Sequence, residues 1–317
     1  WDVEVISNRS SDLIREIDLI EEIARLIGYD QFDQNLPAPI NPGKLNSYQL
    51  AKRKLKNGFV ISGFNEVLTY SLVSDEDKTR IKISNPLLQE TSCLRNNIWQ
   101  EHIRICNQNI KAGRESCWIF ETGNIFVNSS TNNQIEILSG AISGNNYDEK
   151  WEFSGKTSEL NYYQARGKLR QVFSHLNVSV IDKPTDKYKY LHPGRTSLLI
   201  IEGKEAGYFG QINPKYIAEK RSLKNLFLFS IDIDKLLMAA IRTNKWTPIF
   251  KDYPIVPKIE RDINFIFSKE YLVSDIISTI KKSGKPILEE VKLIDIYNDD
   301  NLDDKFVSYT FRLSYRD

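Results

Sequence analysis

Four acidic residues near the start of the chain have the types and spacing of a metal site. Asp18, Glu21 and Glu22 stand at positions i, i+3 and i+4, so a helix would place their carboxylates on one face, with Asp12 near its start. Carboxylate oxygens suit Mg²⁺, which takes few protein ligands and keeps several waters. Arginines lie one helical turn from two of these residues. A solvated acidic face with local ion pairs is therefore the alternative, and spacing alone favours it.

A second candidate is the tetrapeptide from His192 to Arg195, with the sequence His-Pro-Gly-Arg. Pro-Gly predicts a tight turn that holds the two flanking side chains in fixed directions, and arginine suits carboxylate or phosphate contacts. The alternative is the start of a hairpin whose arginine lies in a salt bridge.

Signatures of catalysis are few. The chain contains no GxGxxG, GxxxxGK[ST], GxSxG or HExxH motif, and its three histidines are isolated from one another. Its three cysteines form no CxxC pair, which favours reduced thiols over a disulfide framework. The residues alone therefore favour a binding or structural protein over an enzyme.

Length and composition indicate the class of protein in which these residues occur. The chain has 317 residues, 41% of them hydrophobic, and a formal net charge of +1, which predicts about two globular domains. Because the net charge is close to zero, the protein as a whole does not attract nucleic acid. Binding of nucleic acid would therefore need a local patch of basic residues. The longest apolar clusters are too short to span a membrane. The chain begins with Trp1 and has a single methionine, Met238, so we expect it to be a piece of a longer one.

Apolar periodicity predicts the elements that position these residues. Helical spacing recurs over 13–27, and three prolines then predict a linker within 34–44. Beyond the linker, strands outnumber helices and glycine turns join neighbouring strands, which favours an antiparallel sheet with helices, an α+β fold. The expected strands are 67–73, 118–127, 135–143, 196–201, 206–210 and 226–233, and the expected helices are 48–62, 96–111, 162–176 and 234–241.

A second proline-rich stretch, 245–258, predicts another boundary. After it come a strand at 259–267, a helix at 273–283 and strands at 290–297 and 306–315. This β-α-β-β order is the first part of a ferredoxin-like unit, and we expect the unit to be truncated before its last helix and strand.

Several segments together resemble one family, the β subunit of bacterial-type phenylalanyl-tRNA synthetase. They occur in the family's order across nearly the whole chain: EIDLIEEIARLIGYD (16–30), NPLLQETSCLRNN (85–97), IFETGNIF (119–126), LHPGRTS (191–197), GYFGQINP (207–214), YPIVPKIERDINFIF (253–267) and FVSYTFRLSYRD (306–317). The resemblance implies three parts: the tail of a preceding domain over 1–38, a class II synthetase-like core over 45–245 without a working active site, and an incomplete ferredoxin-fold anticodon-binding domain over 250–317.

The resemblance also implies a function. A subunit of this family works in an (αβ)₂ heterotetramer in the cytoplasm, with no membrane partner, and ATP and the aminoacylation chemistry belong to the α subunit. This chain is then expected to be inactive alone, to scaffold the α subunit and to contribute to binding of tRNA(Phe). A stand-alone RNA- or protein-binding paralogue without an α partner is the alternative.

Site residues follow from the resemblance by position. The family's Mg²⁺ ligands, in a site shared with the α subunit, match four carboxylates and reverse the preference drawn from spacing: Asp12, Asp18, Glu21 and Glu22. The candidates for contact with tRNA or a partner subunit are His192, Arg195, Arg261 and Asp262. Residues 251–317 hold 11 Lys and Arg against 13 Asp and Glu, so any affinity of this part for tRNA depends on local basic groups.

Overall fold

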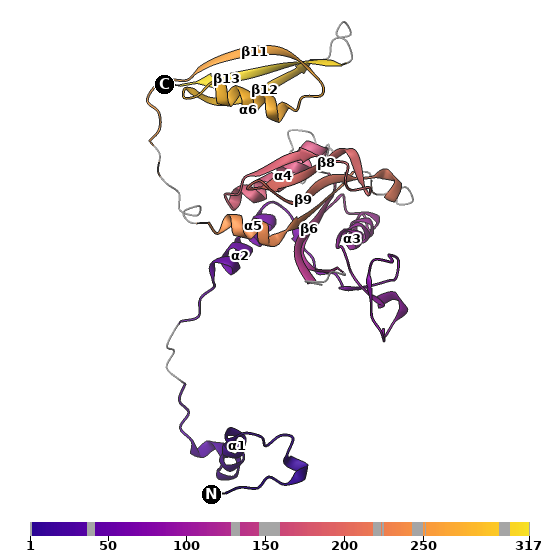
Figure 1. Ribbon diagram of the computed structural model, residues 1–317, viewed down its shortest axis with the longest axis vertical. Helices are drawn as coiled ribbons and strands as arrows, with labels where there is room; N and C mark the ends of the chain where they lie inside the picture. The colour runs from indigo at the N-terminus through magenta and orange to yellow at the C-terminus, as the bar shows by residue number, and fades with distance from the viewer. Residues whose placement is uncertain are drawn as a thin grey trace. The chain divides into compact units, whose positions relative to one another are not determined.

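The computed structural model describes residues 2–36, 42–127, 134–145, 159–217, 223, 225–242, 250, 252–297 and 305–316. The chain divides into two compact units, Trp1–Trp246 and Thr247–Asp317 (Figure 1). No helix in the described ranges is both long enough and apolar enough to cross a membrane.

The first helix, α1 (Glu16–Ile27), lies between two short 3₁₀ turns, η1 (Ser7–Arg9) and η2 (Tyr29–Gln31). Its start is fixed by Asp18, whose carboxylate accepts hydrogen bonds from the backbone N–H groups of Ile14 and Arg15 at 3.0 and 2.7 Å. The helix ends at Gly28, whose φ of +97° lies in a region that favours glycine.

A seven-stranded sheet forms the centre of the first unit. Its strand order is β1-β5-β6-β10-β9-β8-β7, and every pairing is antiparallel except that of β1 with β5. The strands are β1 (Asn65–Glu66), β5 (Ser116–Phe126), β6 (Gln134–Gly144), β7 (Val180–Pro184), β8 (Leu191–Ile201), β9 (Lys204–Ile212) and β10 (Leu226–Asp232). The predicted α+β fold with an antiparallel sheet is confirmed, although the sequence did not indicate β7.

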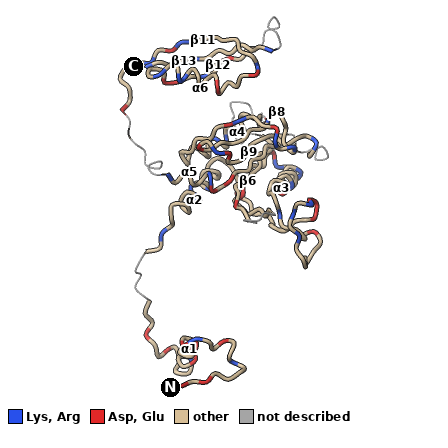
Figure 2. Tube along the Cα trace, viewed as in Figure 1, with Lys and Arg blue, Asp and Glu red and all other residues tan. Residues whose placement is uncertain are grey.

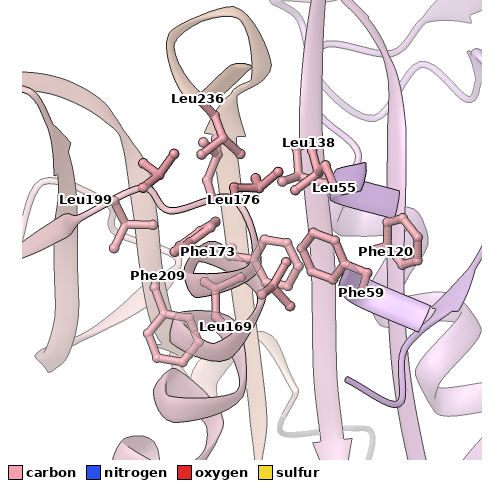
Figure 3. Packing of buried hydrophobic residues seen from close by; sticks show 14 of the residues in the cluster. Leu55, Phe59, Phe120, Leu138, Leu169, Phe173, Leu176, Leu199, Phe209 and Leu236 are labelled. Carbon is pink, nitrogen blue, oxygen red and sulfur yellow. The ribbon is translucent and has the colours of Figure 1, made fainter. Parts of the chain in front are cut away.

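Helices cover both faces of this sheet. On one face pack α2 (Ser47–Ile61), α4 (Tyr162–His175) and α5 (Ile233–Ala240), and their aromatic core includes Phe59 stacked on Phe120 at 4.5 Å (Figure 3). On the other face packs α3 (Trp99–Lys111), which buries Ile103 and Cys106 against Ile119. Because Ile119 and Phe120 are consecutive in β5, their side chains point to opposite faces, and both faces of the strand are buried.

A small sheet precedes α3. It joins β2 (Leu72–Val73), β4 (Cys93–Leu94) and β3 (Ile81–Lys82), with the 3₁₀ turn η3 (Gln89–Thr91) beside it. The prediction of one strand over 67–73 is wrong, because residues 67–71 lie outside any strand. Their backbone is bonded elsewhere: the Val67 N–H donates to Phe120 O, and the Arg95 N–H donates to Ser71 O.

The second unit has the predicted β-α-β-β order. Its sheet, β11-β13-β12, is antiparallel, and α6 packs on one face of it (Figure 1). The bounds are β11 (Ile259–Ser268), α6 (Val273–Ser283), β12 (Leu288–Tyr297) and β13 (Phe306–Tyr315). The core between α6 and the sheet contains Ile276, Val291, Phe311 and Leu313.

Candidate functional site

The acidic residues around α1 are engaged by arginines and by the backbone. Arg9 lies between two of them: its guanidinium donates to Asp12 at 2.9 Å and to Glu22 at 2.6 Å. Glu22 also accepts from Arg25, and Asp18 caps the helix as described. The segment around α1 accordingly carries both acidic and basic residues (Figure 2).

These contacts hold the carboxylates in their ionised form. Hydrogen bonds from Arg9 lower the pKa values of Asp12 and Glu22, and the backbone N–H groups of Arg15 and Ile14 lower that of Asp18. Glu21 is exposed on the same helix. Across the described ranges, no group of three His, Cys, Asp or Glu side chains is arranged to hold a metal ion. The guanidinium of Arg9 lies between the carboxylates of Asp12 and Glu22 and pairs with both.

The His-Pro-Gly-Arg tetrapeptide interrupts the pairing of β8 with β9. The register shifts between Leu191 and Thr196, so the four residues between them have no paired residue on β9. His192 Nδ1 accepts the Gly194 N–H at 3.1 Å, which closes the turn on itself. Arg195 is exposed and donates to Gln211 Oε1 at 2.8 Å. The turn therefore directs the two candidate side chains to different partners.

The candidates on β11 point to opposite faces of the second sheet. Ile263 packs toward the core under α6, so Arg261, two residues before it, lies on that face and Asp262 on the other. Asp262 makes a bidentate ion pair with Arg312, with distances of 2.9 and 2.8 Å, and this pair lowers the pKa of Asp262. A single ligand on one face of the sheet does not contact both Arg261 and Asp262.

The sequence analysis missed a buried polar network in the first unit. Glu121, in the middle of β5, accepts hydrogen bonds from Arg95 at 2.9 Å and from Thr69 at 2.7 Å. His102 Nε2 lies 3.6 Å from the second carboxylate oxygen. Glu121 is 1% exposed and His102 is 0% exposed. The signal was a carboxylate within an apolar strand, since a buried charge requires a partner.

Burial acts in opposite directions on the two titratable groups of this network. Desolvation raises the pKa of Glu121, but the neighbouring His102 ring, the hydrogen bond from Thr69 and the charge of Arg95 outweigh it, so the net shift is downward. Burial lowers the pKa of His102. The network therefore contains an ionised glutamate beside a neutral histidine.

Arg95 of the same network also bonds to an exposed segment, residues 67–73, that carries apolar side chains. Within residues 67–73, Arg95 donates to the Thr69 hydroxyl from its guanidinium and to the Ser71 carbonyl from its backbone N–H, and exposed large apolar side chains alternate with these two residues. Leu68 is 85% exposed, Tyr70 is 81% exposed and Leu72 is 40% exposed. We call Leu68, Tyr70 and Leu72 the apolar stripe. Exposed apolar side chains that recur along one segment are typical of a protein interface.

Two family models match the chain. The phenylalanyl tRNA synthetase beta chain CLM domain matches residues 34–233, and the ferredoxin-fold anticodon binding domain matches residues 254–317. An α+β core followed by an anticodon-binding domain defines a subunit of an aminoacyl-tRNA synthetase. The chain belongs to the phenylalanyl-tRNA synthetase beta chain family.

Its relatives carry the corresponding name. The phenylalanine–tRNA ligase beta subunit of Prochlorococcus marinus (strain MIT 9312) is 66% identical over 316 residues, which cover 100% of this chain and 39% of the relative. The beta subunit of Synechococcus sp. (strain CC9902) is 45% identical over 318 residues, again covering 100% of this chain and 39% of the relative. The chain thus spans about 39% of the length of the curated relatives it matches. A pyrrolysyl-tRNA synthetase from Desulfitobacterium hafniense aligns with a TM-score of 0.44 at 13% identity, over 60% of this chain and 65% of that one.

Proposed function

We propose that this chain is a non-catalytic part of the β subunit of a cytoplasmic phenylalanine–tRNA ligase. It scaffolds an α subunit within an (αβ)₂ heterotetramer and contributes to the binding of tRNA(Phe), while the α subunit uses ATP to attach phenylalanine. The observation that carries the proposal is the succession of the two matched domains along one chain. The proposed parts are 1–38, 45–245 and 250–317, and the boundary between compact units after Trp246 supports the last of these.

The burial of the core supports a scaffolding role rather than catalysis. Its acid–base pair, Glu121 and His102, is closed to solvent, so no substrate reaches either group. Both faces of the seven-stranded sheet are filled by side chains from helices. The relatives carry a subunit name, which does not favour the alternative of a stand-alone RNA- or protein-binding protein.

The apolar stripe supports a partner subunit. Burying large side chains at a subunit interface contributes roughly 25 cal/mol for each Å² removed from water. The stripe itself contains no charged residue that would have to be desolvated. We therefore place the contact with the α subunit at Leu68, Tyr70 and Leu72.

Co-purification tests this proposal. The chain is co-expressed with the α subunit of a relative, in parallel with a Leu68→Ser/Tyr70→Ser variant. The control is Ile181→Ser, which removes an exposed apolar side chain from β7, at the opposite edge of the sheet from β1. The parent and the control are expected to retain the α subunit and the double variant to lose it. Retention by all three proteins would exclude the stripe as the contact, and failure of the parent would contradict the scaffolding role.

Mg²⁺ in the segment around α1 requires a rearrangement. Asp12 and Glu22 become available to a cation only if Arg9 leaves them. We propose that the four carboxylates, Asp12, Asp18, Glu21 and Glu22, bind Mg²⁺ weakly in this chain and more tightly beside an α subunit that completes the ligand set.

A further inference from the structure

A pocket lies between the small sheet and the start of α3. Its volume is about 340 Å³, which falls within the range of small-molecule sites. Its apolar wall consists of Val73 at the end of β2, Trp99 and Ile103 on α3, and Tyr216 at the end of the 3₁₀ turn η5 (Pro214–Tyr216). Arg80, directly before β3, contributes a buried cation to the same pocket.

Arg80 differs from the other buried arginines of the described residues. Three arginines there are at least nine-tenths buried: Arg80 is 8% exposed, Arg95 is 3% exposed and Arg166 is 9% exposed. Arg95 pairs with Glu121 at 2.9 Å, and Arg166 pairs with Asp182 at 2.8 Å. Arg80 forms no ion pair with a carboxylate in the described part of the chain, because both of its hydrogen bonds go to neutral oxygens.

The two hydrogen bonds of Arg80 leave part of its guanidinium without an acceptor. Nη1 donates to the Ser74 carbonyl at 2.6 Å, and Nη2 donates to the side-chain oxygen of Gln100. Nε is buried and has no hydrogen-bond partner among the described residues. A guanidinium carries N–H donors in a fork that matches a carboxylate, so Arg80 retains the capacity to bind one.

The acidic residues near Arg80 are engaged with other groups. Asp75 forms an ion pair with Lys82, and Asp77 accepts a hydrogen bond from Asn96 at 2.9 Å. The charge of Arg80 acts on Asp75 and Asp77 only at longer range. A buried charge normally has a partner in contact with it. An anionic ligand in the pocket would supply that partner.

The surroundings favour an anion of single charge with an apolar body. The pocket lies at the N-terminal end of α3, where the helix dipole favours negative charge. Glu76 and Glu101 also line the pocket and oppose an anion that carries two charges, such as phosphate. The ring of Trp99 stacks on Tyr190 at 4.6 Å, which fixes its orientation and leaves an apolar surface in the wall of the pocket.

We propose that this pocket binds a small organic monocarboxylate with an aromatic or branched apolar body. Arg80 pairs with the carboxylate, and the apolar wall packs against the body of the ligand. The inference is separate from the proposed function, because the pocket is formed by this chain alone and involves neither tRNA nor the apolar stripe.

Calorimetric titration of the whole chain with three probes tests the inference. The probes are 2-naphthoate, 2-naphthamide, which keeps the ring without the charge, and inorganic phosphate, which has the charge without the ring. The parent is expected to bind 2-naphthoate about tenfold more tightly than 2-naphthamide, because a hydrogen-bonded charge pair is then added to the same apolar contact. Phosphate is expected to bind more weakly than 2-naphthoate.

Three results with the parent would overturn the inference. Absence of 2-naphthoate binding at millimolar concentration would exclude the site. Equal affinity for 2-naphthoate and 2-naphthamide would exclude recognition of the carboxylate. Phosphate binding as tight as that of 2-naphthoate would exclude the proposed ligand class.

Two arginine variants test the role of Arg80. Arg80→Gln is expected to weaken binding of 2-naphthoate about tenfold and to leave the affinity for 2-naphthamide unchanged. The matched control is Arg104→Gln, which makes the same change at an exposed arginine of the pocket that already pairs with Glu101 at 2.7 Å. The control is expected to keep the preference for 2-naphthoate. Equal losses in the two variants would overturn the assignment of the carboxylate to Arg80.

A third variant covers the case in which Arg80→Gln does not fold, which circular dichroism detects. Tyr216→Ala shortens the apolar wall at a half-exposed residue and keeps both hydrogen bonds of Arg80. It is expected to weaken 2-naphthoate and 2-naphthamide several-fold and by the same factor, because both lose the same apolar contact. Unchanged affinity for both probes would show that they bind elsewhere, which would overturn the inference.

Discussion

Arg95 Nη1 donates to Glu121 Oε1 across 2.9 Å, and both side chains are almost completely buried. Arg95 follows the small sheet, and Glu121 lies in the central part of β5, so the pair ties the irregular segment 67–98 to the large sheet. Arg95 also donates to the Asn124 and Thr69 carbonyls. The orientation of the apolar stripe therefore depends on a charge pair inside the protein.

Breaking this pair is expected to be costly. Glu121→Gln removes the carboxylate charge and leaves the guanidinium of Arg95 buried without a counter-charge, so the free energy of unfolding should fall by about 3–5 kcal/mol. Urea denaturation followed by circular dichroism measures the change. Glu66→Gln, which opens a partly exposed pair with Lys56, is the control and should cost about 1 kcal/mol or less. Similar losses for the two variants would contradict a structural role for the buried pair.

Acid should destabilise the core through His102. Burial lowers the pKa of His102 below its ordinary value of 6.5, so below pH 6.5 the unfolded chain binds a proton that the folded chain does not, and stability falls as the pH falls. The groups that face His102 are Glu121 and Ser139, with Arg95 and Glu101 at longer range. Because the pKa of Glu121 is lowered from 4.5, the stability that it contributes is lost as the pH falls below that value.

Stability measured at a series of pH values checks the histidine effect. His102→Gln should reduce the fall in the free energy of unfolding that begins as the pH drops below about 6.5. His175→Gln changes an exposed histidine of α4 and should leave the profile as it is. A decline of equal steepness in His102→Gln and the parent would assign the acid sensitivity to other groups.

Two glycines should respond to alanine in opposite directions. At Gly140 in β6 a Cβ would lie 2.2 Å from Phe229 Cζ and 2.5 Å from Ile119 O, so Gly140→Ala should destabilise the core by about 1–3 kcal/mol or more. At Gly167, within α4, a Cβ meets nothing within 4 Å. Gly167→Ala should therefore stabilise the protein by about 0.5–1 kcal/mol through helix propensity. Thermal denaturation of both variants measures the two changes in melting temperature. Melting temperatures that shift in the same direction would contradict the packing of β6 against β10.

Removing Arg9 should expose a cation site. Arg9→Gln frees Asp12 and leaves Glu22 paired with Arg25 alone, so titration calorimetry with Mg²⁺ should detect tighter binding than in the parent. Arg15→Gln is the control, because Arg15 pairs with Asp18 alone among the four carboxylates. Adding Glu21→Gln and Glu22→Gln to the Arg9 variant should abolish the gain. Equal, undetectable binding by all these proteins would mean that the acidic residues serve only the fold of this segment.

The sequence by itself determined the elements whose pattern is local. The bounds of α6 and β13 agree with those expected, because each has an uninterrupted period of apolar residues and a clear end. The α+β class and the β-α-β-β order follow from such periods as well. Residues 67–71 do not form the expected strand because the Thr69 hydroxyl and the Ser71 carbonyl accept hydrogen bonds from Arg95, a partner more than twenty residues away.

Only the tertiary structure decided which charged groups meet. Arg9 reaches Glu22, Arg95 reaches Glu121 and Arg312 reaches Asp262, over separations of 13, 26 and 50 residues. Local spacing identifies acidic residues that share a helix face, but it does not locate a guanidinium that arrives from another part of the chain. The free energy of an ion pair depends on distance and burial, and both are set by how the elements pack.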